Sequence, residues 1–102
     1  MTERVALRVA ADHPAFAGHF PGRPIVPGAL LVDLAVLAVE RACGRQVTAI
    51  AQAKFLSPAT PGEALVLQFE MHEAAVRFEI ESVADNTRRK LASGRFTLGE
   101  PA

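Results

Sequence analysis

One stretch of the sequence is apolar on every side of the helix that it would form. Residues 29–39 are apolar apart from Asp33, and a helix without a polar stripe is normally buried all round. The charged Glu40 follows too soon for a membrane span, which needs about 20 apolar residues. Pro27 suits the first helical turn, and Gly44 suits the residue after the last turn. We therefore predict a core helix that begins near Pro27 and ends just before Gly44.

A loop rich in proline and glycine, residues 18–28, leads directly into this helix and contains His19. Its prolines restrict the backbone, and its glycines allow tight turns. Asp33 needs an explanation, because burying an unpaired charge is costly unless the pKa of the carboxyl rises until the group is neutral. For Asp33 alone, a structural carboxylate that caps a neighbouring loop and a catalytic carboxyl are equally open.

The start of the predicted helix adds backbone donors to these two side chains. Gly28 and Ala29 would present unpaired N–H groups at the positive end of the helix dipole. A base at His19, an acid at Asp33 and these N–H donors are the parts needed to remove a proton beside a carbonyl group.

The segment HPAFAGHFPGRPIVPGALLVD, residues 13–33, resembles the active-site segment of the 3-hydroxyacyl-acyl-carrier-protein dehydratases of the hot-dog fold. Their pattern is approximately PFFxGHFPGxPxxPGxLxxE/D. The residues in register are Pro14, Phe16, Gly18, His19, Phe20, Pro21, Gly22, Pro24, Ile25, Pro27, Gly28, Leu30 and Asp33. A second segment, KFLSPATPGEALVL from Lys54, resembles the RFxxPVxPGDxL element of the same family.

Two positions depart from the pattern of the commoner family branch. The acid is Asp33, as in the branch that can also isomerise its product, whereas the commoner branch carries Glu. Leu37 stands where both branches usually place a Gln on the same helix face. The orientation of Asp33 is therefore not set by a neighbouring amide.

The composition bounds the class of protein. The 102 residues, 50% of them hydrophobic, fit one domain (1–102) that buries roughly 60–70% of its unfolded surface, so oligomerisation would add useful burial. Eleven basic and eleven acidic side chains argue against a nucleic-acid surface. A single cysteine, Cys43, builds neither a disulfide framework nor a metal site, and the three histidines have no metal-binding spacing. The charged N-terminal sequence lacks the apolar run of a signal peptide, so we expect a cytoplasmic protein with no membrane span.

Alternating apolar and polar residues predict strands on both sides of the helix. The predicted strands are residues 4–9, 46–56, 64–72, 75–84 and 90–98, with turns at 57–63 and 85–88. The strand at 46–56 is expected to turn Val47, Ala49, Ala51, Ala53 and Phe55 to one face. One buried helix with short connections between strands predicts an α+β fold, in which a curved antiparallel sheet wraps the helix. The resemblance identifies this architecture as the hot-dog fold.

The resemblance implies reversible dehydration of a 3-hydroxyacyl thioester to the trans-2-enoyl thioester, in fatty-acid or specialised acyl-chain biosynthesis. His19 would be the base at C2, the N–H of Gly28 would hold the thioester oxygen, and a protonated Asp33 would donate to the departing hydroxyl. Ala29 would add a second donor, while Phe16 and Phe20 would form loop walls that contact the acyl chain. No cofactor or metal is required, because the leaving group is water.

The resemblance also implies partners: an acyl carrier protein or coenzyme A thioester as substrate, and a homodimer or an oligomer of such dimers. In that dimer two sheets join edge to edge, and His19 of one subunit works with Asp33 of the other. Two alternatives stay open, a hot-dog acyl thioesterase and a non-catalytic acyl-binding protein. We expect His13 and His72 in exposed positions. The basic cluster 88–90 is expected to be a solvated turn, with docking of an acidic carrier protein as the alternative.

Overall fold

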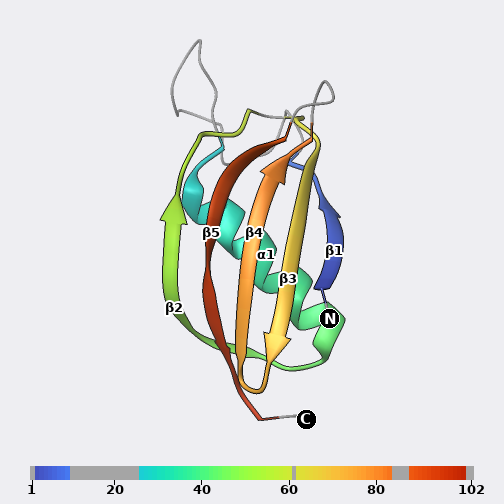
Figure 1. The fold of residues 1–102 in the computed structure, drawn as a ribbon, viewed down its shortest axis with the longest axis vertical. Helices are drawn as coiled ribbons and strands as arrows, with labels where there is room; N and C mark the ends of the chain where they lie inside the picture. Colours follow the sequence, from blue (N-terminus) through green and yellow to red (C-terminus); the bar gives the residue numbers. More distant parts are fainter. Residues whose placement is uncertain (1, 10–25, 61, 84–87, 101–102) are drawn as a thin grey trace.

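The computed structural model describes residues 2–9, 26–60, 62–83 and 88–100. In this part of the chain, the helix α1 (Gly28–Cys43) lies against one face of a five-stranded antiparallel sheet (Figure 1). The strands are β1 (Thr2–Leu7), β2 (Val47–Phe55), β3 (Leu65–His72), β4 (Ala75–Ser82) and β5 (Arg89–Leu98). The predicted α+β architecture is confirmed.

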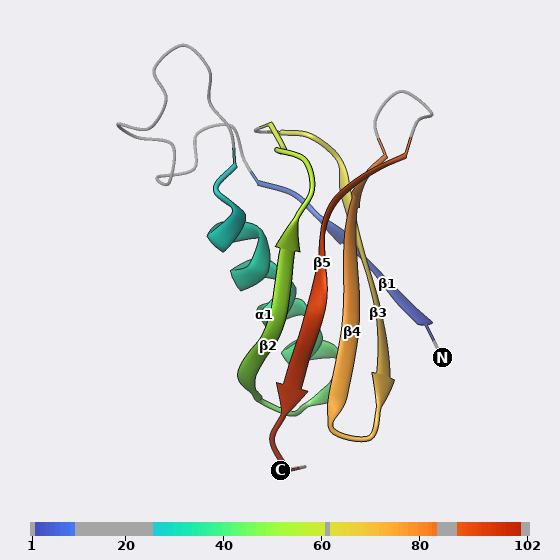
Figure 2. The ribbon, with the colours of Figure 1, turned by 60° about the vertical axis from the view of Figure 1, so that its left-hand side comes forward.

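The strand order in the sheet is β1-β3-β4-β5-β2, so β1 and β2 form its two edges. The sheet curves around α1, which Figure 2 shows along one side of the strands. The hairpin predicted between residues 64 and 84 is confirmed, because β3 and β4 pair from Leu65 and Ser82 down to His72 and Ala75. Glu73, in the turn of this hairpin, adopts the left-handed conformation with φ 57°.

The core lies between α1 and the concave face of the sheet. Alternate residues of the central strands point into it, as the period of two predicts. The largest fully buried side chains are Phe69, Phe78, Phe96, Leu31, Leu67, Ile80, Leu91, Val39 and Val76. The rings of Phe78 and Phe96 stack with their centroids 4.4 Å apart. Each such side chain contributes about 1.5–3 kcal/mol by leaving water, so this layer holds α1 in place.

The ends of α1 agree with the sequence. Pro27 stands immediately before the first helical residue, with φ −57° and ψ 138°. Gly44 adopts the left-handed conformation with φ 70°, and its N–H donates to the carbonyl oxygen of Glu40 at 2.9 Å. Within the described ranges, no helix is long and apolar enough to cross a membrane.

The prediction that α1 is buried all round is wrong for the single chain. Its buried residues are Leu31, Val32, Ala35 and Val39, which form the stripe facing the sheet. Asp33 is exposed, and Leu37 keeps 51% of its surface exposed on the opposite face. The sheet of one chain covers only one side of a helix, so the remaining apolar face of α1 is left without a covering layer from the described residues.

The predicted alternation of β2 holds at Val47 and Phe55, which pair with the buried Leu98 and Ala92 of β5, but it fails at Ala49 between them. Register shifts interrupt its pairing with β5 between Val47 and Ala49 and again between Ile50 and Gln52. Such bulges insert an extra residue and reverse the faces that follow. Ile50 pairs with the buried Phe96 and therefore lies on the concave face, where sequence alternation had placed Ala49.

Apart from Phe55 at its end, which contacts the start of α1, the edge strand β2 is largely uncovered by the described residues on both faces. Every residue after Val47 in this strand is exposed, including Ile50 at 52% and Phe55 at 56%. Its one neighbour in the sheet is β5. An exposed apolar edge of this length is a template for pairing with another strand.

Candidate active site

The start of α1 is held by the connection between β2 and β3. The N–H of Val26 donates to the carbonyl oxygen of Ala59 at 2.8 Å, which forms an isolated bridge just before the helix. The carbonyl oxygen of Pro27 then accepts from the N–H groups of Leu30 and Leu31 at 3.0 and 3.3 Å. Among the described residues, no side chain caps this end of the helix. The position of the first turn therefore depends on backbone contacts.

Gly28 and Ala29 occupy the positions in the first turn that the sequence predicted. Within the described part of the chain, no hydrogen bond ties up the N–H group of either residue. Both residues line an open hollow of about 570 Å³ beside the helix start. Its other lining residues are Val26, Pro27, Leu31, Phe55, Leu56, Ser57 and Pro58. The helix start thus offers N–H donors to a largely apolar hollow, which suits a carbonyl oxygen attached to an acyl chain.

Phe55 was not among the predicted site residues, yet its ring lies against Gly28. A Cβ atom added to Gly28 would come within 2.7 Å of Cε1 and 2.8 Å of Cδ1 of that ring. Any side chain at position 28 would therefore displace Phe55 or the helix start. The motif that begins KFLSP contained this signal, since it brings an aromatic residue to the end of β2, opposite the helix start.

Asp33 lies on the face of α1 that turns away from the sheet. One helical turn separates it from Ala29 on one side and from Leu37 on the other, so all three share this exposed face. No hydrogen bond or ion pair joins its carboxyl group to another described residue. The apolar enclosure expected for Asp33 is not supplied by the described part of a single chain.

Three predicted site residues, His19, Phe16 and Phe20, lie outside the described residues, as does His13. The segment that contains them, 10–25, is flanked by two described residues that contact the same connection. The carbonyl oxygen of Val9 accepts from the N–H of Gly62 at 2.8 Å, and Val26 donates to Ala59. Both flanks of the segment are thus attached beside the start of α1.

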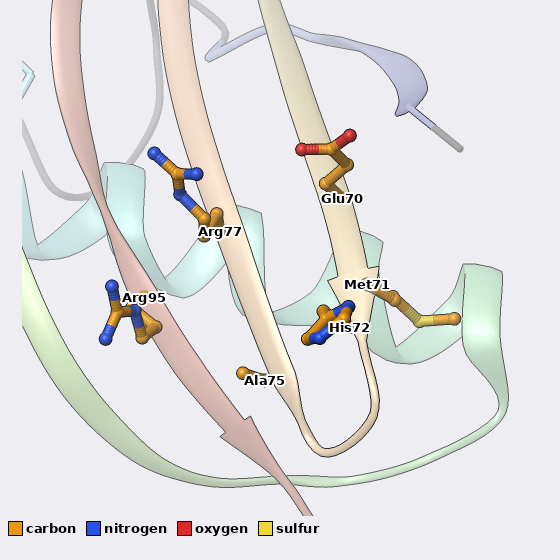
Figure 3. A pocket seen from close by; sticks show the side chains of 6 residues that line it. All are labelled: Glu70, Met71, His72, Ala75, Arg77 and Arg95. Carbon is orange, nitrogen blue, oxygen red and sulfur yellow. The ribbon is translucent and has the colours of Figure 1, made fainter.

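A second hollow, of about 480 Å³, lies on the outer face of the sheet (Figure 3). It is lined by Glu70, Met71, His72, Ala75, Arg77 and Arg95. Figure 3 shows Arg77 leaning away from the carboxylate of Glu70, and no ion pair or hydrogen bond links the charged groups of this hollow to one another. His72 is exposed, as predicted. The sheet separates this hollow from α1, so the helix start remains the candidate site.

The prediction of a solvated turn at 88–90 is wrong in part, because Arg89 and Lys90, although exposed, are the first residues of β5. Arg89 forms an ion pair with Glu63 at 3.0 Å, and Lys90 forms one with Glu79 at 3.4 Å. In the described ranges, no three side chains of the metal-binding types gather as a metal site requires.

Comparisons with known proteins identify the family of this chain. The family model described as ApeI dehydratase matches residues 2–95. The 3-hydroxyacyl-acyl-carrier-protein dehydratase FabZ of Wolbachia sp. subsp. Drosophila simulans is 41% identical over 99 residues, which cover 87% of this chain and 69% of that protein.

Solved structures extend the likeness to the fold. An uncharacterized protein from Erwinia carotovora subsp. atroseptica is 28% identical, with a TM-score of 0.83 over 96% of this chain and 82% of that chain. The dehydratase heterocomplex ApeI:P from Xenorhabdus doucetiae is 23% identical, with a TM-score of 0.80 over 97% of this chain and 88% of that chain. The predicted hot-dog fold is confirmed. The family match covers most of the sequence, and we conclude that the chain belongs to the ApeI-like dehydratase family.

Proposed function

We propose that this dehydratase removes water from a 3-hydroxyacyl thioester to give the trans-2-enoyl thioester, and that it also catalyses the reverse reaction. The observation that carries the proposal is the helix start, where Gly28 and Ala29 line an apolar hollow large enough for part of an acyl thioester. The FabZ relative is named for this reaction on an acyl carrier protein. We take carrier-bound chains as the first substrates to test, with coenzyme A thioesters second. A cytoplasmic location stays a prediction.

The proposed roles follow from the chemistry of the substrate. The proton at C2 is acidic because the neighbouring thioester carbonyl accepts the developing charge, and His19 would remove it. The N–H of Gly28 would hold the carbonyl oxygen, a contact worth on the order of 3 kcal/mol in the transition state. Asp33 would donate a proton to the departing hydroxyl at C3. The products are then the enoyl thioester and water.

One assay separates this proposal from its two alternatives. The protein is incubated with a 3-hydroxyacyl thioester and, separately, with the matching enoyl thioester, while enoyl absorbance and free thiol are followed together. Interconversion without thiol release supports dehydration. Thiol release without interconversion would show a thioesterase, and neither signal would indicate an acyl-binding protein or the wrong substrate. Family membership favours the first outcome.

We further propose that the working form is a homodimer joined through β2. This strand is an uncovered edge, and the exposed face of α1 with Asp33 and Leu37 lacks a covering layer from the described residues. Antiparallel pairing of two β2 strands would form a two-fold interface and extend the sheet across both subunits. The solved ApeI relative is described as a heterocomplex, so a related chain is the alternative partner to test.

A charge on the concave face of β2 is expected to break the dimer. Ile50→Glu would place an unpaired carboxylate in the interface, and a cost of about 3 kcal/mol would weaken association by roughly 100-fold. Sedimentation over a range of concentrations measures the change. Ala49→Glu is the matched control, because Ala49 pairs with the exposed Thr97 on the outer face. An Ile50→Glu protein that dimerises like the wild type would contradict this interface.

A side chain at position 28 is expected to damage turnover more than stability. Gly28→Val would crowd the ring of Phe55 and move the N–H that holds the thioester oxygen, so turnover should fall by roughly 10- to 100-fold. Stability should change less, because Phe55 is exposed and its ring can move. Turnover and melting temperature are measured on the same preparations.

The second substitution Phe55→Ala provides the control for this clash. In the double variant the ring is gone, so part of the lost turnover should return if crowding is the cause. If the melting temperature of Gly28→Val collapses in step with its activity, the glycine serves the backbone, and its proposed contact with the substrate is unsupported.

A further inference from the structure

We infer that Glu63 is a positioning residue for the dehydration, because it fixes the connection on which the start of α1 rests. Together with Arg89, it would hold the N–H groups of Gly28 and Ala29 in the geometry that the reaction needs. The inference rests on the proposed function, since it assumes that the substrate carbonyl binds at the helix start.

The carboxylate of Glu63 is nearly buried, and both of its oxygens accept hydrogen bonds. Its side chain is 9% exposed. One oxygen accepts from the backbone N–H of Thr60 at 3.0 Å and from the hydroxyl of Thr60 at 2.9 Å, and the other accepts from Nη2 of Arg89 at 3.0 Å. Hydrogen bonds to an ionised group are roughly twice as strong as neutral ones. This one side chain therefore links Thr60, in the connection between β2 and β3, to Arg89 at the start of β5.

The ionised form of Glu63 is the one that makes these contacts. Burial raises the pKa of the carboxyl, but hydrogen bonds from Ser82 and Thr60 and the charge of Arg89 outweigh it, so the pKa lies below the ordinary value of 4.5. Because the folded-state pKa is lowered, the stabilisation is present at neutral pH and is lost only as the pH falls through that lowered value. Glu63 is therefore charged under ordinary assay conditions.

Arg89 ties the same connection to the body of the sheet. While Nη2 contacts Glu63, Nη1 donates to the carbonyl oxygen of Pro58 at 2.8 Å. The planar guanidinium group is suited to such a two-sided contact. Arg89 is the first residue of β5 and pairs with Ser82 of β4, so the connection is attached to two central strands.

Between these two anchors lies the residue that contacts the helix start. Ala59, which is fully buried at 0% exposure, stands between Pro58 and Thr60, and its carbonyl oxygen accepts from the N–H of Val26 at 2.8 Å. Val26 is followed directly by Pro27 and Gly28. Since no side chain caps α1, this bond is the nearest fixed point for the first turn among the described residues. Loosening Glu63 would therefore shift the N–H donors.

A shift of this kind has a kinetic signature. Misplacing a catalytic group by about 1 Å can lower the rate by up to roughly 100-fold. The contact of an N–H with the carbonyl oxygen strengthens in the transition state, so its loss should lower kcat more than it raises KM. A purely structural role would instead lower the melting temperature and leave kcat of the folded protein unchanged.

The test compares Glu63→Gln, Arg89→Met and their double variant in the enoyl assay, well below their melting temperatures. Each single variant should lose about 10-fold in kcat with KM changed less than about twofold, and the double variant should lose little more, because both act on one contact. Glu63→Asp should retain much of kcat, since it keeps the carboxylate. Glu79→Gln is the matched control: it removes the exposed ion pair with Lys90 on the outer face and should leave kcat unchanged.

The backbone amide signals of Gly28 and Ala29 in a ¹⁵N–¹H spectrum give a readout that needs no substrate. They should move in Glu63→Gln and Arg89→Met and stay in place in Glu79→Gln. Unmoved signals, or wild-type kcat with a lowered melting temperature, would overturn the inference. If the wild type dehydrates no 3-hydroxyacyl thioester, the proposed function fails, while the amide signals still decide whether Glu63 positions the helix start.

Discussion

Asp33→Asn is expected to lower turnover of a 3-hydroxyacyl thioester by roughly 100-fold or more while the protein remains folded. The amide keeps the shape of the carboxyl but has no proton to give to the departing hydroxyl. Folding should survive, because Asp33 lies on the exposed face of α1 and makes no hydrogen bond with another described residue. Enoyl absorbance measures turnover, and thermal melting followed by circular dichroism checks the fold.

Asp33→Glu is the conservative control for this experiment. It keeps a proton donor, and the family pattern carries Glu at this register in its commoner branch, so this variant should retain much more turnover than Asp33→Asn. Leu37→Gln adds the amide that the pattern usually places one turn later, which tests whether the donor needs orienting. Near-wild-type turnover of Asp33→Asn would refute the role of Asp33 as proton donor.

An unfractionated mixture of two inactive chains is expected to recover about a quarter of wild-type activity, and the isolated mixed dimer about half, if each site takes His19 from one subunit and Asp33 from the other. In a dimer of a His19→Ala chain with an Asp33→Asn chain, one site carries both lesions and the other carries none. Random association makes about half of the dimers mixed, and each of these has one working site of two. Co-expression with two different tags isolates the mixed dimers for the enoyl assay.

A second mixture is the control for the first and is expected to give the opposite result. Wild-type chains are combined with chains that carry both His19→Ala and Asp33→Asn. Shared sites make every mixed dimer inactive, whereas sites built within one chain leave each mixed dimer with one working site. Because His19 lies outside the described residues, this pair of mixtures tests its placement directly. Activity in the second mixed dimer and none in the first would refute the shared site.

Much of the fold was predictable because local patterns determine it. The alternation in residues 64–84 predicted the hairpin of β3 and β4, and Pro27 and Gly44 marked the ends of α1. These features depend on backbone preferences of residues close together in the sequence. The start of the candidate site, Gly28 and Ala29, was predictable for the same reason, since it lies where a proline-rich loop meets a helix.

Other features depend on residues far apart in the sequence and were missed. The bulges of β2 exchange the faces of Ala49 and Ile50, and side-chain period gives no sign of them. An apolar helix pattern predicts burial but does not indicate whether the same chain or a partner chain covers each face. The prediction that a single chain buries α1 on all sides was therefore wrong. The contact of Glu63 with Arg89 joins residues 26 positions apart, and it forms because the register of β4 with β5 brings Arg89 to that end of the sheet.

Because β2 is an exposed edge strand, we expect the thermal stability of the protein to depend on its concentration. A partner that binds only the folded chain stabilises it by mass action, so the melting temperature of the proposed dimer should rise with protein concentration. The strand VTAIAQAKF has no proline and one charged residue, Lys54. It therefore has few of the features that prevent edge strands of natural proteins from pairing with other chains. A subunit diluted below its dissociation constant would expose this edge to unrelated strands. At low protein concentration, the proposed dimer would then be lost through aggregation of the separated subunits as well as through dissociation.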